Sequence, residues 1–94
     1  MPYVLVRHKV EDYAKWKPVF DEHGATRKTY GSKGGYVFRN VDDPNEVVIL
    51  IEGDDLEKIR QFAQSEDLRQ TMQRAGVADQ PDVYFLEETD RPSV

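Results

Sequence analysis

Two histidines are the side chains of this sequence best suited to proton transfer near neutral pH. His8 stands at an even position of a strand-like segment, among Val4, Val6 and Val10, and His23 stands on the apolar stripe of a helix-like segment. Burial among apolar side chains holds an imidazole neutral and able to accept a proton. His8 is therefore the candidate catalytic acid or base. The alternative for each histidine is that it is a half-buried residue whose ring is hydrogen-bonded within the protein and has no chemical role.

Aromatic side chains accompany the histidines at helical spacing. Tyr13, Trp16, Phe20 and His23 recur three or four residues apart and so share one face of a helix. Together with His8 they would wall a pocket suited to a flat organic ligand, which makes these four the candidate substrate-binding residues. The alternative is that the aromatic residues are ordinary core.

The composition excludes several other kinds of chemistry. The 94 residues carry 18 acidic and 13 basic side chains, a formal charge of −5 that opposes binding to nucleic acid or to anionic membranes. There is no cysteine, hence no thiolate nucleophile and no cysteine-based metal site. With two histidines and no carboxylate at ligand spacing, we expect no metal. The first residues enter a strand pattern at once, without the features of a signal peptide, so we expect a cytoplasmic protein.

The elements that must position these residues can be predicted from periodicity and turn signals. Alternation predicts strands over 3–10, 36–41 and 83–88, with the even positions of the first strand on its apolar face. A helix follows the Asp12 cap, with a kink or short first turn before Pro18 and an end at Gly31. A second helix runs from 55 to 75, interrupted near Ser65, where a new cap would restart it, and ended by Gly76. Residues 1–94 form one domain with a polar tail over 91–94.

One stretch constrains the architecture more than any other. Val47–Ile51 is a run of five apolar residues bounded by turn signals, which is typical of a strand buried on both faces. The order of elements predicts an α+β, ferredoxin-like βαββαβ fold: a four-stranded antiparallel sheet with both helices on one face. The chain has nothing left to cover the other face. A second copy is the simplest cover, so we expect a homodimer in which two sheets meet.

The segments 6–16, 20–23, 34–39, 47–51, 63–65 and 74–77 together resemble the dimeric α+β barrel superfamily. Its members include antibiotic-biosynthesis monooxygenases and polyketide cyclases. The resemblance implies a two-sheet barrel in a homodimer and a small-molecule-binding protein that acts as a cofactor-independent monooxygenase or cyclase on an aromatic or polyketide-like compound. The alternative is a non-catalytic ligand-binding or structural dimer of the same fold.

The same resemblance bears on one further residue and on haem. Monooxygenases of this superfamily hold a phenolic substrate with Asn, Trp and Arg side chains. Trp16, Arg39 and Asn40 are of those types, which makes Arg39 a substrate-binding candidate. They do not form a motif with fixed spacing, and the alternative is that Arg39 is an exposed surface arginine. Haem-degrading members use a histidine from the second helix and an asparagine from the first strand. This chain has neither, and we expect no cofactor.

Overall fold

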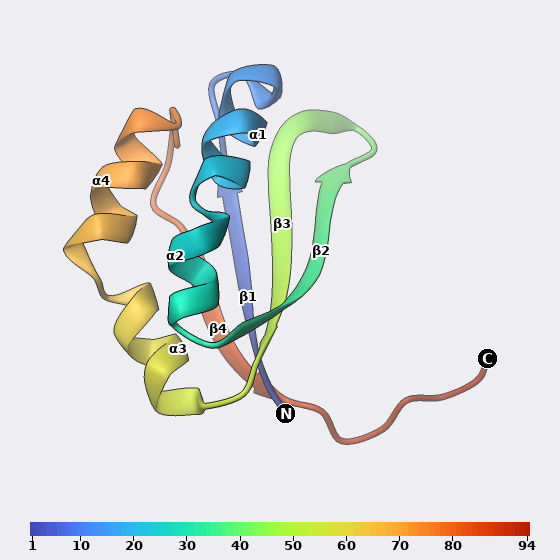
Figure 1. Cartoon of the computed structure of the whole chain (residues 1–94). Helices are drawn as coiled ribbons and strands as arrows, with labels where there is room; N and C mark the ends of the chain where they lie inside the picture. Colours follow the sequence, from blue (N-terminus) through green and yellow to red (C-terminus); the bar gives the residue numbers. More distant parts are fainter.

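The computed structural model describes residues 1–94, which form a sheet covered on one side by helices (Figure 1). The elements in chain order are β1 (Pro2–Lys9), α1 (Tyr13–Glu22), α2 (Gly24–Thr29), β2 (Ser32–Asn40), β3 (Asp43–Gly53), α3 (Leu56–Ala63), α4 (Glu66–Arg74) and β4 (Asp82–Glu87). None of the helices has the length and hydropathy of a membrane span.

The sheet has the predicted topology. Its strand order is β2-β3-β1-β4, with every neighbouring pair antiparallel, so the first and third strands are central. All four helices lie on the same side of the sheet, and the other side is open (Figure 1). The ferredoxin-like βαββαβ fold is confirmed, with each predicted helix divided into two pieces.

The first helix divides at a different point from the one predicted. Asp12 caps it as expected, its carboxylate accepting a hydrogen bond from the Ala14 amide at 2.9 Å. The predicted short first turn before Pro18 is wrong, because α1 continues through Pro18 to Glu22. Pro18 removes one amide donor, whereas the interruption falls at His23, directly before Gly24, whose backbone freedom makes it a poor helix former. The helix ends before Gly31, as predicted, and Gly31 adopts a left-handed φ of 89°.

The second helix is interrupted where the sequence indicates. Ser65 caps α4, its Oγ accepting a hydrogen bond from the Leu68 amide at 3.1 Å. The same hydroxyl donates to the carbonyl of Phe62 at 2.8 Å and so ties the end of α3 to the start of α4. Gly76 follows α4 with a φ of 81°, as expected of a glycine that ends a helix.

The hairpin between β2 and β3 is tighter than the sequence suggests. The predicted strand over 36–41 and the apolar run over 47–51 leave room for a longer loop, but only residues 41 and 42 separate the two strands. The side chain of Asn40 accepts a hydrogen bond from the Asp42 amide at 2.8 Å, which closes a short turn and lets Asp43 begin the next strand.

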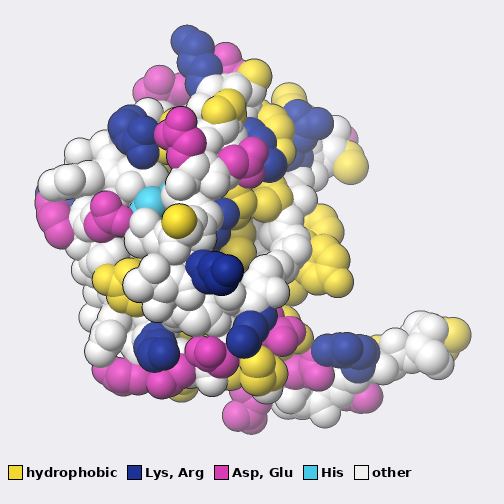
Figure 2. Space-filling view, viewed as in Figure 1, with side chains coloured by type: hydrophobic (Ala, Val, Ile, Leu, Met, Phe, Trp, Pro, Cys, Tyr) yellow, Lys and Arg dark blue, Asp and Glu magenta, His cyan; other side chains and the backbone are white.

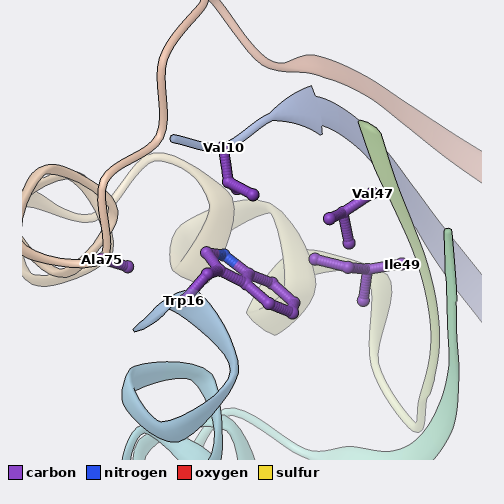
Figure 3. Packing of buried hydrophobic residues seen from close by; sticks show 5 residues of the cluster. All are labelled: Val10, Trp16, Val47, Ile49 and Ala75. Atoms are coloured by element: carbon purple, nitrogen blue, oxygen red, sulfur yellow. The ribbon is translucent and has the colours of Figure 1, made fainter. Parts of the chain in front are cut away.

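The core lies between the helices and the sheet. Its buried members come from four elements or their ends and include Val10, Trp16, Val47, Ile49 and Ala75. Trp16 points from α1 toward Val47 and Ile49 on β3 (Figure 3). A large indole at the centre of this layer accounts for much of the apolar surface that helix and sheet remove from water.

The open face of the sheet is apolar as well. Leu5 on β1 pairs with Leu50 on β3, and Leu50 pairs in turn with Tyr36 on β2. The open face also carries Phe38, Val48, Tyr84 and Leu86. Tyr36 and Tyr84 are 63% and 56% exposed. Hydrophobic side chains gather along the side of the molecule where β2 lies (Figure 2). Within one chain, the run over 47–51 is therefore covered by helices on one face only.

Candidate functional site

A cavity of about 300 Å³ lies between the helical layer and the sheet. Its walls come from β1, β3, all four helices and the segment that leads into β4. Four of the residues predicted as a site line it: His8, Trp16, Phe20 and His23. Two histidines 15 positions apart in the sequence thus share one cavity.

His8 is the most unusual of these residues. It lies on the helix-facing side of β1, as the strand parity predicts, and only 1% of its surface is exposed. Neither ring nitrogen has a hydrogen-bond partner. Burial lowers the pKa of His8 below its ordinary value, an effect that outweighs the nearby charge of Asp79. The imidazole is therefore neutral at pH 7, with one nitrogen free to accept a proton.

A row of stacked side chains leads away from His8. Its ring meets Trp16 edge-on, with the ring centres 5.8 Å apart, and Trp16 stacks on Phe20 at 4.9 Å and an interplanar angle of 23°. The guanidinium carbon of Arg27 lies 3.7 Å from the centre of the Phe20 ring. The row thus joins β1 to α2 along the cavity and lines it with aromatic side chains.

His23 is in a different state from His8. Its Nε2 lies 2.7 Å from Oδ2 of Asp67 on α4, which accepts the hydrogen bond. Its ring packs against Phe62 of α3, with the ring centres 5.7 Å apart. His23 therefore ties the point where the first helix divides to the helices on the opposite side of the cavity. The ring of His23 is hydrogen-bonded within the protein, whereas that of His8 is not.

Two predicted substrate-binding residues lie elsewhere. Tyr13 and Arg39 do not line the cavity. The guanidinium carbon of Arg39 lies 4.4 Å from the centre of the Tyr13 ring, which in turn packs against Trp16. These two residues support the indole from outside the cavity.

Sequence reasoning missed several residues of the cavity as site residues. Phe62 and Met72 fall on the apolar stripes of the second helix, which identify core positions but not the walls of a cavity. Arg27 continues the inward-facing stripe of the first helix, but its spacing alone gave no reason to assign it to a site. Asp67, which pairs with His23 but does not line the cavity, carries no sequence signal, because His23 is 44 positions away. No three His, Cys, Asp or Glu side chains lie together as a metal site would require.

Comparison with solved structures shows where this architecture recurs. SnoaB, a cofactor-independent oxygenase from Streptomyces nogalater, superposes with a TM-score of 0.78 at 14% identity, covering 99% of this chain and 97% of SnoaB. The chain has the fold of the antibiotic biosynthesis monooxygenases. A protein described by that name superposes with a TM-score of 0.72 at 17% identity, covering 96% of this chain and all of the other.

Rv0793 from Mycobacterium tuberculosis shares this monooxygenase fold too, with a TM-score of 0.69 at 13% identity over 99% of this chain and 100% of Rv0793. No family model matches the sequence. No curated protein matches it either. Identities this low show a common fold and do not show a common activity.

Proposed function

We propose that this protein binds a flat aromatic or polyketide-like molecule in the cavity between helices and sheet, and that His8 removes a proton from it. The observation that carries the proposal is the state of His8, which is buried, faces the cavity and has no partner for either ring nitrogen. Leaving a buried polar group unpaired costs about 1–3 kcal/mol. A hydroxyl group of a bound ligand would supply the missing hydrogen bond.

The chemistry follows from a neutral base in an apolar site. His8 accepts a proton from a phenol or from a carbon next to a carbonyl group, and the ligand becomes an electron-rich anion beside the imidazolium. Such an anion can pass electrons directly to O₂. A CH₂ group and O₂ then give a carbonyl group and one water, which is a monooxygenase reaction without a cofactor. Attack of the same anion on a carbonyl group of its own chain closes a ring instead, which is the cyclase reaction.

The shape of the site supports a planar ligand. A cavity of about 300 Å³ is at the small end of the range for small-molecule sites. Trp16 and Phe20 are stacked on each other, so they line the cavity with ring edges, and edge-to-face contact is a favoured arrangement for an aromatic ligand. The fold shared with SnoaB, a cofactor-independent oxygenase, also supports the proposal.

We also propose that the protein is a homodimer that buries the open face of the sheet against a second copy. The apolar residues of that face form a continuous surface across all four strands, including Leu5, Leu50, Tyr36 and Tyr84. Monomers rarely leave such a surface in water, and a two-fold pair is the commonest way to cover it.

Titration of hydroxylated polycyclic compounds, followed by fluorescence and by O₂ uptake, tests the proposed reaction. The unmodified protein should bind a member of the panel and consume O₂ or cyclise it, and His8→Leu should abolish turnover. Lys28→Gln is the control, because it changes an exposed side chain outside this cavity and should keep binding and turnover. Binding without turnover in the unmodified protein would instead identify a non-catalytic ligand-binding dimer. Absence of binding across the panel would contradict the proposal.

A further inference from the structure

We infer that the ligand is an anion and that Arg27 is the subsite that binds its negatively charged group. The inference deepens the proposed function by naming the substrate class: an aromatic compound that carries a carboxylate or another acidic oxygen. It depends on the cavity being a ligand site, as proposed above.

The pairing of charges around the cavity singles out Arg27. His23 is hydrogen-bonded to Asp67 at 2.7 Å, and Glu66 forms an ion pair with Arg69 one turn further along α4. Arg27 also lines the cavity, but it forms no ion pair with any carboxylate. Among the charged side chains of the cavity wall, it is the one that forms no ion pair within the protein, and only the charge of Asp21 acts on it from further away.

The guanidinium of Arg27 has donors to spare. Its Nη1 donates one hydrogen bond, to the carbonyl of Phe20 at 2.7 Å, and its plane rests over the Phe20 ring. A guanidinium carries five N–H donors in a fork that matches the two oxygens of a carboxylate. Stacking on the Phe20 ring holds the guanidinium in one orientation. Binding of a carboxylate would therefore cost little further conformational entropy of the Arg27 side chain.

Burial strengthens the case for an anion. The surrounding protein lowers the pKa of Arg27, because burial disfavours its charged form. The group nonetheless stays protonated near pH 7, since arginine loses its proton only far above that range. A half-buried cation in an apolar cavity interacts with an opposite charge more strongly than one in water does. The net charge of −5 repels anions from the molecule as a whole, so retention of an anionic ligand would depend on this local cation.

The positions of Arg27 and His8 define how the ligand would lie. The row of rings runs from His8 through Trp16 and Phe20 to Arg27, with each member in contact with the next. A planar ligand laid along this row would place its acidic group at Arg27 on α2 and its reacting hydroxyl or C–H at His8 on β1. Arg27 thus acts as a positioning and specificity residue, with the ring wall between it and the base.

A matched pair of ligands tests the inference: 6-hydroxy-2-naphthoate and its methyl ester, which differ in charge but share a two-ring system with a hydroxyl at the far end. We expect the unmodified protein to bind the acid at least about ten-fold more tightly than the ester in a fluorescence titration. Arg27→Met should remove this preference by weakening the acid alone, and Arg27→Lys should keep part of it. Lys28→Met is the control, because it deletes the neighbouring charge of the same helix outside this cavity and should keep the preference.

The outcomes separate the two proposals. Equal affinity for acid and ester in the unmodified protein, or a preference that survives in Arg27→Met, would overturn the role of Arg27 and leave the cavity as a ligand site. Failure of both compounds to bind would overturn the proposed function together with this inference. Circular dichroism melting of each variant establishes that the protein is folded during the titration.

Discussion

The burial of His8 is unfavourable for folding, but it leaves the imidazole in the state that the proposed proton transfer requires. Its neighbours on the strand face are apolar, and both of its nitrogens lack partners. Proteins usually give a buried polar group a hydrogen bond, and exceptions of this kind often mark functional positions. The same observation that supports a role in proton transfer therefore makes a prediction about stability.

Replacing His8 with leucine should leave the free energy of unfolding unchanged or raise it by about 1 kcal/mol, because an apolar residue of similar size would replace an unpaired polar group. Urea unfolding followed by circular dichroism measures this difference. The matched control is His23→Leu, which should destabilise the protein, since it breaks a hydrogen bond and leaves Asp67 without its partner. A marked loss of stability in His8→Leu would contradict the prediction and indicate a native partner for the ring.

The lowered pKa of His8 also predicts how stability depends on pH. The unfolded chain binds a proton at His8 near pH 6.5, whereas the folded protein binds it only at lower pH. Between these two pKa values the unfolded state binds more protons, so the free energy of unfolding rises with pH in this range. The contribution of His8 reaches its full value above about pH 6.5. The free energy of unfolding should therefore fall as the pH drops below about 6.5.

Comparison with His8→Leu isolates this effect from that of the carboxylates. The difference in free energy of unfolding between the two proteins should be constant above about pH 7 and should grow in favour of the variant as the pH drops toward 5. Denaturant unfolding at several pH values measures it. A difference that does not change with pH would mean that His8 titrates normally in the folded protein.

At the scale of elements, the two interrupted helices are held at their breaks by side chains. Ser65 joins α3 to α4 through two hydrogen bonds, one to each helix. Ser65→Ala should lower the free energy of unfolding by about 1 kcal/mol, because it removes the cap of α4. Urea unfolding measures the loss, and Ser93→Ala, in the exposed tail, is the control and should have no effect. Equal stability of both variants would show that the cap contributes little.

At the scale of the whole molecule, the open face of the sheet predicts the assembly. Sedimentation at micromolar concentration should give about twice the chain mass of 10.9 kDa. Leu5 and Leu50 lie opposite each other on the open face, so a lysine at either position should release monomer and lower stability together. Leu56→Lys, which places the same charge on a partly exposed leucine of the helical layer, should leave the dimer intact. A stable monomer of the unmodified chain would contradict this prediction.

Local pattern in the sequence determined most of the fold. Alternation in residues 3–10 fixed which face of β1 meets the helices, because side chains of a strand point to opposite faces in turn. The cap at Ser65 and the glycines at positions 31 and 76 fixed where helices begin and end. The order of the elements then predicted the ferredoxin-like arrangement, because short connections and right-handed crossovers permit few other topologies. These features depend on neighbours in the chain, which a sequence displays directly.

The tertiary structure alone decided which of the candidate residues line one cavity. It paired His23 with Asp67, left His8 without a partner, and placed Arg39 on Tyr13 outside the cavity. It also brought Arg27 to the cavity wall without an ion-pair partner. Each of these outcomes depends on contacts between elements distant in sequence. Periodicity shows which face of an element a side chain occupies, but only packing of the elements against one another decides which polar groups find a partner there.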